Sequence, residues 1–269
     1  MKTSNGFVLA SVTALGCWMG IKATSQPLHQ STAFIAQIEK RFKKSFNDQN
    51  PSIQHVIYAR KSDGSFVHIF DSESPDRKQS ESMKEIYDTP KSLNIILEPF
   101  TKSVINHQYS SREYRQIVGA LEYENCDDSQ TTSAGRKVVD GQSRTKFGRQ
   151  AMHEVERIPL AANTDSQMEW IHERYVVPEL RCFSMHTIDR RSDGAVTEEE
   201  VVSFHEGEPP ESYFYVPPGY VERSPRELNE AYAKKFGKGQ DFWPQPAVLG
   251  MERRYQRLKA NSKAKENAK

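Results

Sequence analysis

The chain lacks the features that define several common classes of protein. It has 3 cysteines in 269 residues, and its 37 basic and 36 acidic residues nearly cancel. Gly-rich phosphate loops, nucleophile elbows and CxxC pairs are absent from the sequence. Balanced charge argues against bulk binding of nucleic acid, which requires a basic surface. With 36% hydrophobic and 10% aromatic residues, the chain still has enough apolar material to build a core.

Long apolar runs are missing as well. The longest, Phe7–Ile21, has about 15 residues, fewer than the ~20 that span a bilayer. Lys2 gives it a positive start and Ala23 offers a small-residue cleavage site, so we interpret residues 1–23 as a signal peptide. An uncleaved N-terminal anchor and a lipoprotein, from the partial lipobox Ala14–Cys17, are the alternatives. The chain is expected in the bacterial periplasm, or anchored to the inner membrane and facing it.

Turn signals between extended runs predict an antiparallel sheet. Asp63-Gly64 and Asp193-Gly194 each separate two such runs, and Asp140-Gly141 does so less cleanly. Asp-Gly favours the two-residue type I′ turn, which fixes the pairing across each hairpin. That pairing places Phe183 opposite Phe204, Met185 opposite Val202, Cys182 opposite His205, and His68 opposite Ala59. Further strands are expected at Met83–Tyr87, Leu93–Leu97, Lys102–Tyr109, Tyr114–Tyr123, Arg144–Phe147, Met152–Ile158 and Glu169–Val176.

Helical patterns occur at the two ends. Ser31–Phe46 carries an apolar stripe, formed by Phe34, Ile35, Ile38, Phe42 and Phe46. Ser224-Pro225-Arg226-Glu227 has the form of a capping box and predicts a helix to about Phe236. The predicted class is mainly β (α+β): a curved antiparallel sheet or half-barrel at 28–224, an N-terminal helix on one face, and a helical extension at 225–269. Its basic end can contact an anionic membrane surface, or simply dock and fray.

Export gives the cysteines a specific meaning. After cleavage only Cys126 and Cys182 remain, and an even pair in an oxidising compartment favours a disulfide. The sharper alternative is a Cys182 nucleophile with His205 as its base. No third group that would orient the histidine is evident in the sequence. The disulfide is therefore the preferred interpretation.

No other pattern points to chemistry. His153, His172, His186 and His205 are scattered without the spacing of metal ligands. Glu198-Glu199-Glu200 alternates between the faces of a strand, which favours a solvated hairpin flank over a paired acid and base. The sequence therefore predicts no catalytic residues, no metal site and no cofactor.

Several short motifs resemble a family of uncharacterised exported bacterial proteins. They run from Val138 to Ser224 and end in a Gly-Glu-Pro and Phe-x-Val-Pro-Pro-x-Tyr strand exit: Val138-Val139-Asp140-Gly141, Arg157-Ile158-Pro159, Glu173-Arg174-Tyr175, Pro178-Glu179-Leu180, Gly207-Glu208-Pro209-Pro210 and Phe214–Tyr220. In strand layout the chain is also similar to the periplasmic lipoprotein-carrier fold, an open half-barrel with a helix over its concave face. The family supplies no activity, and fold alone does not fix function.

The resemblance implies a non-catalytic envelope protein. An acyl chain or a lipidated partner would be held between the sheet and the covering helix, with Phe34, Ile38 and Phe42 as candidate ligand-binding residues. A sensor or scaffold that binds another envelope protein is the second interpretation. A thiol-dependent enzyme is the third.

Overall fold

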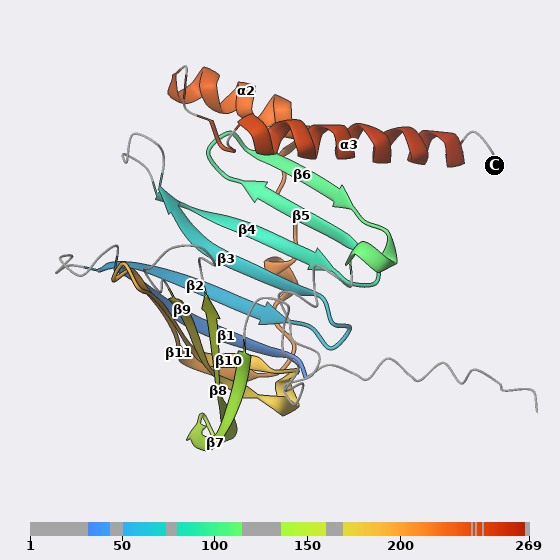
Figure 1. The fold of residues 1–269 in the computed structure, drawn as a ribbon. Helices are drawn as coiled ribbons and strands as arrows, with labels where there is room; N and C mark the ends of the chain where they lie inside the picture. The colour runs from blue at the N-terminus through green and yellow to red at the C-terminus, as the bar shows by residue number, and fades with distance from the viewer. Residues whose placement is uncertain are drawn as a thin grey trace, which may run out of the picture.

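The described part of the chain is built around one curved sheet of twelve strands (Figure 1). The computed structural model describes residues 32–43, 51–73, 80–114, 136–159, 169–237, 239, 241–243 and 245–266. The strands are β1 (Phe34–Lys43), β2 (Ser52–Arg60), β3 (Phe66–Glu73), β4 (Ser80–Asp88), β5 (Leu93–Glu98), β6 (Ser103–Gln108), β7 (Arg136–Lys146), β8 (Arg149–Pro159), β9 (Glu169–Val177), β10 (Phe183–Arg191), β11 (Val196–Glu206) and β12 (Val221–Glu222).

Neighbouring strands follow the order β12-β6-β5-β4-β3-β2-β1-β11-β10-β9-β8-β7. All pairs are antiparallel except β12 with β6, which is parallel and two residues long. Two long meanders, β2 to β6 and β7 to β11, therefore join through β1 at the middle of the sheet. The predicted class, a mainly β protein with a curved antiparallel sheet and C-terminal helices, is confirmed.

The predicted N-terminal helix over Ser31–Phe46 is wrong. Phe34–Lys43 forms β1, a central strand that pairs with β2 on one side and β11 on the other. Phe34, Ile38 and Phe42 are spaced by four residues, which places them on one face of a helix and equally on one face of a strand. Periodicity alone therefore cannot distinguish a helix from a strand over these residues. Hydrogen bonding to β2 and β11 selects the strand.

The Asp-Gly hairpins occur where predicted, but their loops are longer than two residues. In the first, Lys61 N donates to Ser65 O at 2.8 Å and Gly64 N donates to Lys61 O at 3.1 Å, and the second repeats both bonds. The glycines Gly64 and Gly194 each have φ +85°, whereas Asp63 and Asp193 do not have positive φ. These are type I turns followed by a glycine bulge rather than type I′ turns.

The extra loop residue shifts both hairpin registers by one position. Arg60 pairs with Phe66, so His68 lies opposite Tyr58 and not opposite Ala59. His205 lies opposite Ile35 of β1, and β10 begins only after Cys182. The proposed Cys182 and His205 pair is therefore a wrong prediction. The pairing of Met185 with Val202 fails too, because His186 lies opposite Glu200, a register that would bring Met185 to Val201. Val202 is also 47% exposed, whereas Met185 is fully buried.

Two further predicted elements differ. Asp140-Gly141 lies inside β7, where the β7–β8 register shifts between Val139 and Ser143, and a glycine inside a strand commonly marks such an irregularity. The turn comes later, at Phe147 and Gly148, which have φ +52° and +74°. Residues 111–114 are helical, so the strand predicted at Tyr114–Tyr123 does not begin there, and its remainder lies outside the described residues.

The two faces of the sheet bury separate clusters. One face carries an aromatic ladder across β1 to β4, with ring centroids of Phe34 and Tyr58 5.5 Å apart, Tyr58 and Phe66 5.7 Å apart, and Phe66 and Tyr87 4.4 Å apart. The opposite face buries aliphatic side chains of β2 to β6: Ala59, Val67, Ile86, Leu97 and Val104. The segment after β11 crosses this aliphatic face and packs Phe214 and Tyr220 on it.

The crossing segment is the strand exit that carries the sequence resemblance. Its contacts tie it to the first Asp-Gly hairpin: Glu211 accepts from Lys61 Nζ at 2.8 Å, and Glu208 accepts from Ser62 N at 3.0 Å. Lys61 Nζ also lies 4.5 Å from the ring centre of Phe214. These residues therefore have a structural role, because they cover an aliphatic sheet face that would otherwise meet water.

Two helices pack beside β6 (Figure 1). The helix α2 (Pro225–Phe236) begins with the predicted capping box, in which the Ser224 side chain accepts from Glu227 N and Ser224 N donates to Glu227. The helix α3 (Gln245–Glu266) follows, with Arg254 stacked 4.2 Å over the ring of Tyr109. Within the described ranges, neither helix has the length and apolar character of a membrane span.

Candidate functional site

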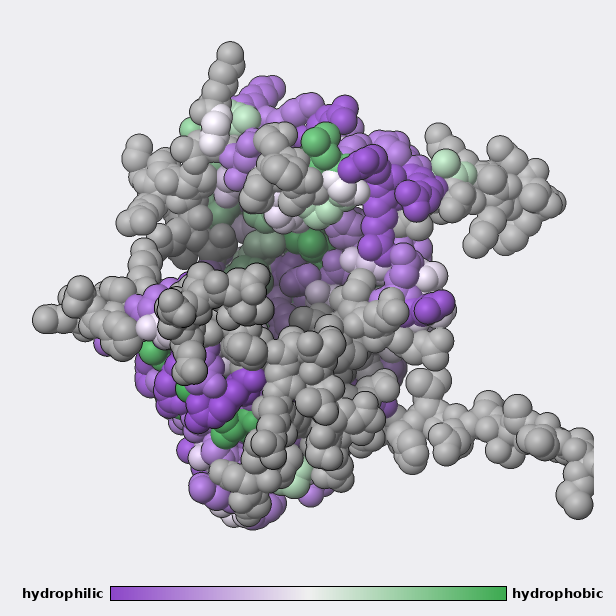
Figure 2. Space-filling model, in the orientation of Figure 1, coloured by the Kyte–Doolittle hydropathy of each residue, from purple (hydrophilic) through white to green (hydrophobic). Residues whose placement is uncertain are grey.

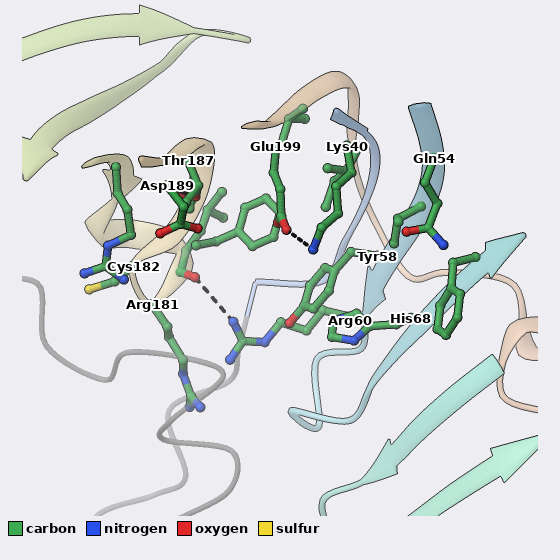
Figure 3. A pocket seen from close by; sticks show the side chains of 18 of the residues that line it. Lys40, Gln54, Tyr58, Arg60, His68, Arg181, Cys182, Thr187, Asp189 and Glu199 are labelled. Atoms are coloured by element: carbon green, nitrogen blue, oxygen red, sulfur yellow. Dashed lines mark hydrogen bonds and ion pairs between the residues drawn. The ribbon is translucent and has the colours of Figure 1, made fainter. Parts of the chain in front are cut away.

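A cavity of about 570 Å³ lies on the face of the sheet that carries the aromatic ladder. Its walls come from β1, β2 and β3 on one side and from β9, β10 and β11 on the other, and residues 180–184 close one end (Figure 3). Figure 2 shows that the molecule is hollowed at its centre on the side displayed, with hydrophobic and hydrophilic residues both visible inside the hollow.

Strand register explains the character of the cavity wall. Ile38 lies between Val56 of β2 and Val201 of β11, which gives an apolar row. Two residues further along β1, Lys40 lies between Gln54 and Glu199, and the same row continues through Thr187, Arg174 and Glu154. Directly opposed residues share a face of the sheet. An apolar row and a polar row therefore lie next to each other along the pocket.

The apolar end is closed by a tight backbone segment. Leu180 is 1% exposed, and Arg181 and Cys182 follow it with φ +55° and +61°, an uncommon conformation for residues other than glycine. Arg60, itself 1% exposed, donates to the carbonyl oxygen of Leu180 at 3.3 Å. This bond ties the end of β2 to the segment that enters β10. Phe183 then packs against Tyr58 with its ring tilted, and the ring centres are 5.0 Å apart.

The polar end contains ion pairs that differ in burial. Lys40 and Glu199 form a contact with side chains 29% and 36% exposed, so solvent and ligands can reach both. Arg174 and Glu154 are 2.5 Å apart with side chains 7% and 2% exposed. Asp189 accepts from His172 Nδ1 at 2.6 Å and from Trp170 Nε1 at 3.0 Å. The charges on this side of the pocket are therefore largely balanced within the protein.

Two histidines, His68 and His107, stay neutral at physiological pH. Burial, with a smaller contribution from Lys40, lowers the pKa of His68 to about 4. Burial and the nearby Arg254 likewise lower the pKa of His107 in β6 to about 4. Neutral imidazoles add polarity to the sheet face without adding charge.

The buried histidines make stability depend on pH. The pKa of His107 is about 4 in the folded protein against 6.5 for an unperturbed histidine, so the unfolded chain binds the proton first as the pH falls. The contribution of neutral His107 to the free energy of unfolding is fully present above pH 6.5. It is lost as the pH falls towards 4, which lowers the free energy of unfolding by about 2 to 3 kcal/mol. Urea unfolding at pH 7 and at pH 4.5 measures this loss. His107→Gln should flatten the dependence, and an unchanged dependence would show that other groups cause it.

The candidate ligand residues have different positions. Ile38 lines the pocket, Phe34 is completely buried in the core beside it, and Phe42 is half-buried two positions beyond Lys40. They share a face, as predicted, but it belongs to a strand. The side chains that sequence reasoning missed are Lys40, Gln54, Arg60, Arg174 and Asp189, and Glu199 was assigned to a solvated hairpin flank. The alternation of apolar and polar residues along each strand was the only sequence feature that could have placed these side chains on the pocket face.

The cysteine prediction is open. Cys182 is buried at the closed end of the pocket. Cys126 lies outside the described residues, as does the leader 1–23, so the Cys126–Cys182 disulfide and the signal peptide stay predictions. Among the residues described, no three histidine, cysteine or acidic side chains group as metal ligands would.

No known protein family and no curated protein matches this sequence. Solved structures that match this chain in a structural comparison include MucB in complex with MucA(peri), at 10% identity and a TM-score of 0.36, where the match covers 71% of this chain and 55% of that one. A LolA-superfamily protein from Nitrosomonas europaea has 7% identity, a TM-score of 0.32 and coverage of 69% and 90%. LprF from Mycobacterium bovis has 6% identity, a TM-score of 0.31 and coverage of 70% and 90%. Values at this level assign no family.

Proposed function

We propose that the protein binds a molecule with a long apolar chain, such as the acyl chain of a lipid or of a lipidated partner, in the pocket between β1–β3 and β9–β11. The supporting observation is the shape of the site. Its lining on β2 runs from Gln54 to Arg60, a span of seven residues that is about 20 Å long in a strand. A cavity of about 570 Å³ is within the usual range for small-molecule sites. The role is to hold the ligand without changing it.

The chemistry of the lining supports the same proposal. Ile38, Val56 and Val201 form the apolar row, and Tyr58 and Phe183 continue it towards the closed end. Apolar surface left facing an open cavity gains free energy when an apolar ligand covers it, at about 25 cal/mol per Å². We place this binding in the bacterial periplasm, or at the inner membrane facing it, because residues 1–23 have the form of a signal peptide.

Filling the cavity should abolish binding. Val56 is half-buried and lines the pocket, so Val56→Trp puts an indole where the chain would lie. We expect the affinity for the uncharged apolar fluorophore N-phenylnaphthylamine to fall at least about tenfold, or 1.4 kcal/mol. Fluorescence titration measures this affinity, and palmitoyl lipids should displace the fluorophore from the wild-type protein.

The matched control is Ile53→Trp in the same strand. Ile53 is 56% exposed and lies on the opposite face, three residues from Val56. This variant adds the same side chain without entering the cavity, so its affinity should match the wild type. Circular dichroism checks that both variants stay folded. Equal affinity of a folded Val56→Trp and the wild type would refute the proposal, as would a wild type that binds neither fluorophore nor lipid.

A further inference from the structure

The polar end of the pocket is a row of side chains from six neighbouring strands. Strand register places Gln54, Lys40, Glu199, Thr187, Arg174 and Glu154 side by side in that order, from β2 to β8. The apolar row lies directly next to it on β2, β1 and β11. A chain bound along the apolar row would therefore bring its head group to the polar row.

Positive and negative charges alternate and cancel along this row. Lys40 is paired with Glu199, and Arg174 is paired with Glu154. A head group with only a negative charge would find each of these cations already neutralised and would also meet Glu199. A head group with only a positive charge would be repelled by Lys40, which lies beside Glu199. A site with a positive and a negative group a few Å apart favours a ligand that itself carries one negative and one positive group.

Asp189 adds a prearranged acceptor in the next row of the same face. Register places it beside Thr197 and His172, one step beyond the polar row. Both of its hydrogen bonds, from His172 and Trp170, end on Oδ1. In the part of the chain that the structure describes, no donor reaches Oδ2, although two donors hold the carboxylate in place. Such an oxygen is suited to an ammonium group, because hydrogen bonds between charged groups are the stronger ones.

Two cations line the closed end of the pocket, Arg60 and Arg181. Arg60 is 1% exposed and is tied to the Leu180 carbonyl, whereas Arg181 is half-buried. Lys40 is 29% exposed at its side chain and can be reached from solvent. The polar end is therefore the part of the pocket where accessible groups of both charges, Lys40 and Glu199, lie together.

We propose that the polar end recognises a zwitterionic head group, with its ammonium on Asp189 and its phosphate towards Lys40, so that the ligand is a phospholipid of the ethanolamine or choline type. This rests on the proposed function, because an apolar chain must occupy the pocket for the head group to reach the row. In this arrangement Lys40 turns from Glu199 towards the phosphate of the ligand, and Glu199 lies near its ammonium group.

Head-group preference is the direct test. Displacement of N-phenylnaphthylamine is compared for four palmitoyl or cetyl probes: lysophosphatidylethanolamine, lysophosphatidylglycerol, palmitate and cetylamine, each below its micelle concentration. We expect the zwitterionic probe to bind at least about tenfold more tightly than the other three, as for one charged hydrogen bond. Tighter binding of an anionic probe, or equal binding of all four, would overturn the inference while leaving the proposed function intact. Binding of none would refute both.

The variant Asp189→Asn tests whether Asp189 causes the preference for a zwitterionic head group. Asp189→Asn keeps an oxygen that accepts from His172 and Trp170 but removes the negative charge, so the affinity for lysophosphatidylethanolamine should fall about tenfold. The affinity for lysophosphatidylglycerol should stay unchanged. Lys43→Gln, on the opposite face of β1, is the control and should leave every probe unaffected. Loss of all probes to the same extent in folded Asp189→Asn would contradict recognition of the head group.

Discussion

Phe34→Ala should lower the free energy of unfolding by about 3 to 5 kcal/mol, as expected for the loss of a fully buried aromatic ring. Phe34 is completely buried, and its ring centre lies 5.5 Å from Tyr58, 4.8 Å from Phe183 and 5.2 Å from Phe204. These partners belong to β2, β10 and β11. One side chain therefore joins both meanders through the central strand, and its removal leaves a cavity that no single element can refill.

Equilibrium unfolding in urea measures the effect, with Phe42→Ala as the control. Phe42 is on the same strand and the same face but is only half-buried, so its replacement should cost clearly less, about 1 to 2 kcal/mol. A covering helix over Ser31–Phe46 would instead make the two losses similar, because both residues would lie on its apolar stripe. Equal losses would contradict the assignment of Phe34 as the residue that joins the meanders.

Arg174→Leu is the second change with a large expected effect. It leaves the carboxylate of Glu154, 2% exposed at its side chain, without its partner at 2.5 Å. Removing one member of a buried ion pair typically costs about 3 to 5 kcal/mol, because the remaining charge stays desolvated. The free energy of unfolding in urea at neutral pH gives the size of this loss.

Two further variants separate the buried charge from the loss of packing. Replacing both partners, Arg174→Leu with Glu154→Leu, should recover most of the stability, because no buried charge remains. Arg157→Leu breaks a pair with Glu169 in the same region, 3.1 Å long and exposed by 58% and 40% at the side chains, and should cost less than about 1 kcal/mol. If the single and double variants lost the same stability, the cost would come from packing rather than from charge.

The sequence predicted correctly those turns and helix ends that depend only on residues close together in the chain. Asp63-Gly64 and Asp193-Gly194 turn the chain where expected because glycine adopts without steric cost the positive φ that each loop needs. The box Ser224 and Glu227 begins α2 where expected because both of its hydrogen bonds lie within four residues. Their strands and helix could therefore be assigned without any knowledge of the rest of the molecule.

The pocket could be predicted only in part. Ile38 was named as a candidate, but from a helical stripe rather than from its strand. Lys40 and Asp189 were not singled out, and Glu199 was interpreted as part of a solvated hairpin flank, because each of them has the pattern of an ordinary solvated strand residue. Strand pairing between residues more than a hundred positions apart brings them together. A single sequence carries no signal for such a pairing, and one extra loop residue changes every partner across a hairpin.

The sequence by itself determined a mainly β protein with two Asp-Gly hairpins, a capped C-terminal helix and an exit segment rich in proline. The tertiary structure alone decided that Phe34–Lys43 is a strand, which residues face each other, and that an apolar row and a polar row line one pocket. The physical reason is that a spacing of four residues satisfies both a helix and a strand. Only hydrogen bonding to β2 and β11, set by the whole sheet, selects between them.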